Sequence, residues 1–265
     1  MTATGAPAVG VPLQAHLCAR RDEGHKLLVP YVTGGIDGDW VDLVRAFADA
    51  GADAIEIGLP FSDPVMDGPT IQEASQRALQ RGTTPRSILA DLRGADVGVP
   101  LVVMTYANIA HQAGWERFAN DLAGAGITGA ILPDLPLEES GPWEAAASAA
   151  GVDAVLLAAP VTPDERLAEL GRRSRGFLYA VTVMGVTGAR TSLSDAAAVL
   201  ARRCKASTDL PVLLGFGVST PAQAGELAAH GDGVIVASAL MRLVLDGAMP
   251  ADVARLVADL RTGLD

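Results

Sequence analysis

The chain has 265 residues, a mass of 27.1 kDa and a net charge of −11 at pH 7. This length suits one α/β domain with a sizeable core, and the acidic charge argues against nucleic acid and anionic membranes as partners. No apolar run approaches a membrane span, and no signal-like segment opens the chain, so we expect a cytoplasmic protein. The histidines and cysteines are scattered without ligand spacing, and no metal site is predicted.

Residues 1–11 are predicted to form a disordered tail, and residues 12–265 a single domain that opens with an extra helix around residues 13–21. Apolar, β-branched runs then mark eight candidate strands, which begin near Leu28, Ala54, Pro100, Thr128, Val152, Phe177, Pro211 and Gly233.

Segments with helical spacing of apolar residues separate these runs. In the first of them, Asp39 is a predicted N-cap for a helix whose apolar face contains Trp40, Leu43, Val44 and Phe47. Eight β-then-α units favour a (β/α)₈ TIM barrel with an extra N-terminal helix. A doubly wound sheet is the alternative, but such sheets usually have fewer strands.

The second candidate strand contains a carboxylate, Glu56, between Ile55 and Ile57. A strand that is apolar on both faces is typical of the centre of a parallel sheet. Burial there raises the pKa of a carboxyl group, so that it can donate a proton as well as accept one. A glutamate buried in an ion pair inside a barrel fits the same pattern equally well.

A second carboxylate, Asp67, follows after a Pro-rich loop and directly precedes Gly68 and Pro69. Apolar spacing predicts a helix that begins there, so Asp67 taken alone is more simply an N-cap. Acid–base catalysis, however, uses two carboxylates in unlike surroundings. The pair Glu56 and Asp67 is therefore a candidate catalytic pair.

Three glycine- or serine-bearing segments follow the sixth, seventh and eighth candidate strands, at residues 185–188, 215–220 and 236–239. Free backbone amides and helix N-termini bind phosphate without lysine, which suits an acidic protein. Each segment alone is weak evidence, because Ser219 and Ser238 are also ordinary helix caps. Their shared position after the last strands is, however, a recurrent phosphate site of barrels.

The intervals from the second to the third strand and from the sixth to the seventh are the longest in the chain. They contain the loop at residues 60–64 and the loop at residues 185–188. We expect this extra length to lie in βα loops at the C-terminal face of the barrel, where barrel enzymes have their active sites.

Five motifs occur in order along the chain: residues 56–72 (EIGLPFSDPVMDGPTIQ), 104–108 (MTYAN), 133–140 (PDLPLEES), 185–190 (GVTGAR) and 215–219 (GFGVS). With these motifs the chain resembles the alpha subunit of tryptophan synthase from about residue 13 onward, and the first motif is highly specific. The resemblance implies a retro-aldol cleavage of indole-3-glycerol phosphate to indole and glyceraldehyde 3-phosphate.

The resemblance also implies roles for single residues. Glu56 matches the general acid–base, and Asp67 matches the carboxylate that accepts a hydrogen bond from the indole N–H. Tyr179 matches a residue beside the reacting centre, although a tyrosine of the barrel core fits that position nearly as well. The remaining matches are the apolar indole pocket of Tyr31, Ile71, Met104 and Ile131, the closing loop with Thr187, and the phosphate contacts Gly188, Gly217, Ala237 and Ser238.

Two positions depart from the family pattern. Ala237 stands where the family commonly has glycine, and the loop at residues 33–39 lacks the usual Gly-Asp-Pro turn. Neither includes Glu56 or Asp67, and a specialised paralogue stays an open alternative.

The partner implied by the resemblance is a tryptophan synthase beta subunit that carries pyridoxal phosphate, in an alpha2beta2 complex. Residues 60–63 and 134–139 are predicted to contact it, and this chain itself is expected to bind no cofactor. Two other functions are weighed. One is a non-catalytic activating subunit; the other is a sugar-phosphate epimerase or isomerase, whose usual histidine cluster or lysine acid–base has no match here.

Overall fold

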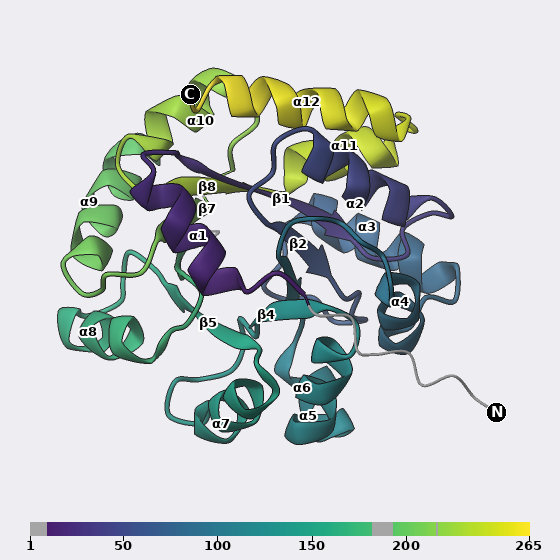
Figure 1. The fold of residues 1–265 in the computed structure, drawn as a ribbon, viewed down its shortest axis with the longest axis horizontal. Coiled ribbons are helices and arrows are strands. Elements are labelled where there is room, and N and C mark those ends of the chain that lie inside the picture. Colours follow the sequence, from purple (N-terminus) through teal and green to yellow (C-terminus); the bar gives the residue numbers. More distant parts are fainter. Residues whose placement is uncertain (1–9, 182–192, 216) are drawn as a thin grey trace.

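The computed structural model describes residues 10–181, 193–215 and 217–265. Their eight strands are all parallel and close into one barrel in the order β1 to β8 (Figure 1). The predicted (β/α)₈ barrel is therefore confirmed, and each strand begins within one residue of its predicted start. The strands are β1 (Leu27–Thr33), β2 (Ile55–Gly58), β3 (Leu101–Met104), β4 (Ile127–Ile131), β5 (Asp153–Ala158), β6 (Leu178–Val181), β7 (Val212–Gly215) and β8 (Gly233–Val236).

Twelve helices occur in the described part of the chain, and most of them surround the barrel. None of the described helices is long and apolar enough to cross a membrane. They are α1 (Leu13–Asp22), α2 (Trp40–Asp49), α3 (Pro69–Gln80), α4 (Pro85–Leu92), α5 (Ala107–Ala113), α6 (Trp115–Ala123), α7 (Gly141–Ala150), α8 (Asp164–Arg173), α9 (Leu193–Lys205), α10 (Pro221–Ala228), α11 (Ser238–Leu245) and α12 (Pro250–Thr262).

Two details of the connections differ from the prediction. Much of the extra length between β2 and β3 forms the additional helix α4, which follows α3 in the chain. Only the part from Leu59 to Gly68 is a βα loop. Asp39 does occupy the N-cap position of α2, but its side chain forms no capping hydrogen bond. The amphipathic face of α2, including Trp40 and Phe47, is buried as expected and is sufficient to fix the helix.

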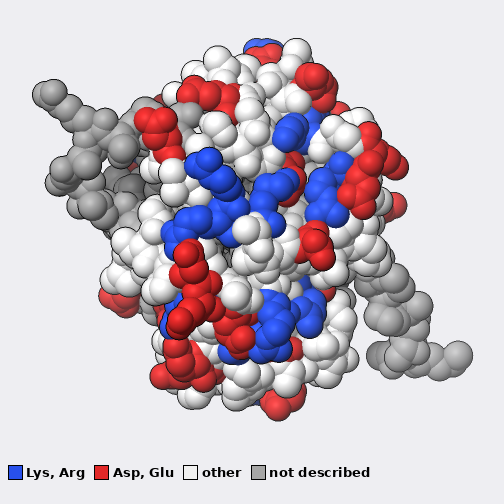
Figure 2. Space-filling model, turned by 90° about the vertical axis from the view of Figure 1, so that its left-hand side faces the viewer, with Lys and Arg blue, Asp and Glu red and all other residues white. Residues whose placement is uncertain are grey.

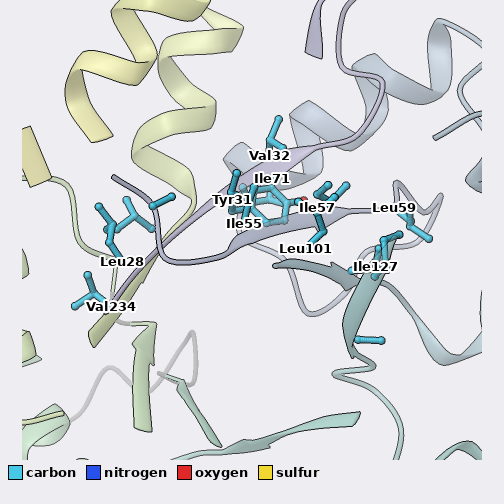
Figure 3. Packing of buried hydrophobic residues seen from close by; sticks show 14 of the residues in the cluster. Leu28, Tyr31, Val32, Ile55, Ile57, Leu59, Ile71, Leu101, Ile127 and Val234 are labelled. Atoms are coloured by element: carbon cyan, nitrogen blue, oxygen red, sulfur yellow. The ribbon is translucent and has the colours of Figure 1, made fainter. Parts of the chain in front are cut away.

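The barrel interior is filled by apolar side chains from, or directly next to, the strands, two from β1 and one from each of the others. Because side chains alternate across a strand, the intervening residues form a second and larger core layer, which packs against the helices; Figure 3 shows part of it. Two leucines of α1, Leu13 and Leu17, complete the inner layer, and α1 lies across the barrel in Figure 1. The strand-derived interior residues are Leu27, Val29, Ala54, Val102, Ile131, Val155, Phe177, Leu213 and Ile235.

One surface of the molecule carries many basic side chains, but they lie among acidic ones (Figure 2). On α8, Arg173 pairs with Glu144 of α7 at 2.6 Å. Arg203 of α9 pairs with Asp164 of α8 at 2.8 Å. These ion pairs join neighbouring helices, so the surface does not form a uniformly basic field of the kind that binds nucleic acid.

Residues 1–9 of the predicted tail lie outside the described residues. Val11, the last residue of the predicted tail, is held in place: its carbonyl accepts a hydrogen bond of 2.7 Å from the Thr128 hydroxyl.

A buried carboxylate, Asp53, joins three elements next to the start of β2. It accepts hydrogen bonds from the Leu28 amide of β1 (2.8 Å), from Arg20 Nε of α1 (3.0 Å) and from Arg261 Nη1 of α12 (3.1 Å). The side chain is only 3% exposed. A buried carboxylate with three donors, two of them cationic, connects the first helix and the last helix to the barrel.

We expect Asp53→Ala to lower the free energy of unfolding by about 3 kcal/mol, because it removes the buried acceptor of the Leu28 amide and of Arg261 Nη1. Urea denaturation of the isolated chain measures this. The matched control is Arg255→Ala, which removes an exposed ion pair with Asp252 and is expected to change little. Equal midpoints for the Asp53 variant and the wild type would contradict the structural role.

Candidate active site

Glu56 lies on β2 with its side chain in the interior of the barrel. Ile55 and Ile57 belong to the outer core layer, whereas Ala54 belongs to the inner layer. Alternation along the strand therefore places Glu56 on the inner face with Ala54. The side chain is 2% exposed, and its Oε2 atom has no hydrogen-bond partner among the described residues. An unsatisfied buried carboxyl oxygen is costly and rare, and it is a mark of a functional group.

The surroundings of Glu56 raise its pKa to about 8. The main cause is loss of hydration on burial, and the second is repulsion from the nearby Asp67 carboxylate. No cation of the described residues contributes to this shift, so the alternative of a buried ion pair finds no support. Near neutral pH the group is mainly protonated, as a proton donor must be.

Asp67 ends the loop that follows β2. The N-cap of α3 is Gly68, and the Asp67 side chain does not cap the helix, so the simpler interpretation of Asp67 as an N-cap is wrong. Its carboxylate instead lies beside the Tyr106 hydroxyl, a hydrogen-bond donor that favours its ionised form. Burial raises the pKa of Asp67 to about 6, and the bond from Tyr106 limits that rise. At neutral pH Asp67 is therefore mainly ionised while Glu56 is mainly protonated, which is the predicted pair of unlike carboxylates.

Tyr106 has no assigned role in the sequence analysis. It stands at the N-cap of α5, directly after β3, and it is 4% exposed. Besides contacting Asp67, its hydroxyl accepts a hydrogen bond of 2.9 Å from the Met66 amide. Its ring stacks on Phe61, with centroids 4.9 Å apart. The sequence did contain a signal for a role of Tyr106: the residue lies two positions beyond the end of a barrel strand, within one of the motifs.

The predicted indole pocket consists of side chains from several strands and one helix. Met104 and Ile131 are register partners on β3 and β4 and pack in the inner layer, as does Tyr179 of β6. Tyr31 alternates with Leu27 and Val29 of β1 and so lies on the inner face; Ile71 of α3 is buried, and Figure 3 shows the two side chains next to each other. The structure thus brings four of these side chains to one end of the barrel strands, with Ile71 beside them from α3.

Two features of this lining were not predicted. The Tyr31 hydroxyl forms a 3.2 Å hydrogen bond with the Thr33 hydroxyl, so the lining is not wholly apolar. Leu157 packs with the inner layer and is the register partner of Tyr179. The alternation of Asp153, Val155 and Leu157 along β5 was a signal that could have identified Leu157.

Glycines beside the two tyrosines make room for their rings. A Cβ atom on Gly58 would lie 1.9 Å from the Tyr31 hydroxyl oxygen, and one on Gly215 would lie 2.6 Å from Tyr179 Cε2. Both contacts are shorter than any that real Cβ atoms make. Gly58 and Gly215 therefore let each tyrosine lie against the neighbouring strand.

The candidate phosphate end is described in part. Gly217 has φ of +71° and open space where a Cβ would be. Ser238 is the first residue of α11, and no side chain at the N-cap Ala237 bonds the first-turn amides. These amides are free to bind an anion. Thr187 and Gly188 lie outside the described residues. Within the described residues, no group of His, Cys, Asp and Glu side chains could hold a metal ion.

Comparisons with known proteins give one consistent match. The family model described as tryptophan synthase alpha chain matches residues 17–260. The alpha chain of Streptomyces avermitilis is 45% identical, over 89% of this chain and 87% of that protein. A Thermobifida fusca alpha chain is also 45% identical, over 88% and 89%.

Solved structures show the same likeness in three dimensions. A chain of Mycobacterium tuberculosis tryptophan synthase superposes with a TM-score of 0.88 at 40% identity, covering 96% of this chain and 98% of that one. The tryptophan synthase subunit alpha of Legionella pneumophila gives 0.86 at 30% identity, with the same coverage. A family match over most of the length, together with a shared fold, establishes that this chain belongs to the tryptophan synthase alpha chain family.

Proposed function

We propose that Glu56 and Asp67 carry out the reaction of this family in the present chain. That reaction is the retro-aldol cleavage of indole-3-glycerol phosphate to indole and glyceraldehyde 3-phosphate, a carbon–carbon lyase step of tryptophan biosynthesis. The observation that carries the proposal is the pair of carboxyl groups with separated pKa values, about 8 for Glu56 and about 6 for Asp67. One proton donor and one anion are then present together at neutral pH.

In the proposed mechanism Glu56 first transfers its proton to C3 of the indole ring. The ring becomes an iminium-like cation, and its N–H donates a hydrogen bond to the ionised Asp67, whose charge stabilises it. The ionised Glu56 then accepts the proton of the hydroxyl on the carbon attached to C3. That carbon becomes the aldehyde, the C–C bond breaks, and its electrons return to the ring to give indole. Glu56 ends protonated, as it began.

The remaining predicted residues are proposed to hold the substrate. Tyr31, Ile71, Met104 and Ile131 would pack on the indole ring, with Tyr179 beside the reacting centre. The phosphate would be bound by backbone amides and by the closing loop, through Thr187, Gly188, Gly217, Ala237 and Ser238. The glycine at φ +71° and the uncapped start of α11 support this part of the proposal.

A partner is proposed on the same end of the barrel. Val65 and Met66 are 81% and 54% exposed on the loop that leads to Asp67, and exposed apolar side chains next to an active site favour a protein contact. We propose that the partner is a beta subunit that carries pyridoxal phosphate, in a cytoplasmic alpha2beta2 complex. In such a complex the indole product would pass to the partner.

The test is release of indole from indole-3-glycerol phosphate by the purified chain, alone and with a beta subunit. Indole formation that depends on this chain supports the proposal. Absence of indole under both conditions contradicts it. If the chain nevertheless stimulates the beta subunit, the non-catalytic activating subunit becomes the correct function.

The phosphate site allows a matched pair of substitutions. Gly217→Ala is expected to raise KM about tenfold with a smaller change in kcat, because L-residues avoid positive φ and the local amides must move. Gly247 also has positive φ and open space around its Cβ position, but it lies in the turn between α11 and α12. Gly247→Ala should therefore have a similar backbone cost and leave KM unchanged. Equal KM values for both variants would contradict phosphate binding at Gly217.

A further inference from the structure

Tyr106 connects the loop after β2 to the loop that follows β3. It stands at the N-cap of α5, and the adjoining Ala107 amide donates a hydrogen bond of 2.7 Å to Asp134 Oδ1 in the loop after β4. The backbone that carries Tyr106 is therefore held by two barrel strands, β3 through the chain and β4 through Asp134.

The loop from Leu59 to Gly68 is held at both of its ends by this one tyrosine. The Tyr106 ring stacks on Phe61 at 4.9 Å, with 26° between the planes. Its hydroxyl accepts a hydrogen bond from the Met66 amide at 2.9 Å and lies beside the Asp67 carboxylate, whose pKa it lowers. Because the oxygen already accepts from an amide, its own proton is free to be donated to Asp67.

The geometry points to Tyr106 as a positioning residue of the active site: its hydroxyl, which also accepts from the Met66 amide, holds the Asp67 carboxylate in place for the charge that develops on the indole ring. This inference rests on the proposed function and adds to it a residue that does not itself touch the reacting atoms. A hydrogen bond from a buried hydroxyl to an ionised carboxylate orients it and favours its charged form.

The other titratable groups near Asp67 act in the opposite direction or are neutral. Glu56 of β2 interacts unfavourably with it when ionised. Tyr31 of β1 and Tyr179 of β6 are buried phenols whose own pKa values the Asp67 charge raises. The Asp134 charge likewise raises the pKa of Tyr106. Among the described residues, Tyr106 is thus the one group that lowers the pKa of Asp67.

The test is Tyr106→Phe, which keeps the ring on Phe61 and removes only the hydroxyl. We expect kcat for indole release to fall about tenfold near neutral pH, with KM changed less than about threefold. Loss of the donor raises the pKa of Asp67, so the acid limb of the activity profile should move up by about one pH unit. The deficit should therefore be largest on the acid side, whereas a purely structural defect would lower the rate equally at every pH.

Two controls separate the outcomes. Thr105→Val removes the neighbouring buried hydroxyl, which has no hydrogen-bond partner among the described residues, and it should behave as wild type. In an Asp67→Asn background, Tyr106→Phe should cause a much smaller loss of kcat, because only the bond from the Met66 amide is then still lost.

An unmoved acid limb, or an equal loss in the Asp67→Asn background, would overturn the inference. A wild-type chain that releases no indole would instead overturn the proposed function, so the two failures are distinguishable.

Discussion

Glu56→Gln is expected to lower kcat for indole release by about 10²- to 10⁴-fold, the usual contribution of a positioned acid–base. Glutamine has nearly the shape of the protonated glutamic acid that occupies the barrel interior, so the fold and KM should change little. Steady-state kinetics with indole-3-glycerol phosphate measures the loss. Turnover at the wild-type rate would exclude Glu56 as the proton donor.

The same substitution tests the raised pKa without any activity measurement. The folded-state pKa of about 8 lies above the unfolded value of 4.5. Glu56 therefore contributes its full stability below about pH 4.5, and this contribution is lost as the pH rises through 8. Denaturant midpoints of the wild type should fall across this window relative to those of Glu56→Gln. Parallel curves would contradict the raised pKa.

Asp67→Asn is the second substitution with a large expected effect. Asparagine can still accept the indole N–H bond, but it has no negative charge to stabilise the cationic ring. We expect kcat to fall about 100-fold and KM to change less than about threefold, since the interaction strengthens as charge develops. A rise in KM with kcat intact would show that Asp67 serves ground-state binding only.

The pH dependence of this variant provides a second readout. In the wild type, kcat/KM should fall below about pH 6 as Asp67 is protonated and above about pH 8 as Glu56 loses its proton. In Asp67→Asn the acid limb should disappear, and the alkaline limb should remain but move to lower pH, because the Asp67 charge no longer raises the pKa of Glu56. An acid limb that persists would have to belong to another group.

The barrel and its buried glutamate could be predicted because both depend on local sequence pattern. Short apolar runs separated by helical spacing predict alternating strands and helices, and the eight strands were located in this way. Glu56 sits between Ile55 and Ile57, so its burial follows from its immediate neighbours. The interior positions of Met104 and Ile131 likewise follow from alternation along β3 and β4.

The loop contacts could not be predicted, because they join residues that are far apart in the chain. Tyr106 and Met66 are separated by 40 positions, and nothing in either segment specifies their hydrogen bond. The start of α3 was also ambiguous: Asp67 and Gly68 both suit an N-cap, and the contact with Tyr106 decides which one occupies it. The roles of Gly58 and Gly215 depend on tyrosines that lie on other strands.

The pairing of β1 with β8 has a consequence for synthesis on the ribosome. Leu27 to Pro30 find their register partners only at residues 233–236, and Asp53 binds Arg261, which is 208 positions further on. Until β8 leaves the exit tunnel, the nascent polypeptide has an open sheet edge on its first strand. We infer that the barrel cannot close before residues 233–236 have been synthesised and released from the tunnel, and that the unfinished barrel is the stage most exposed to aggregation and chaperone binding.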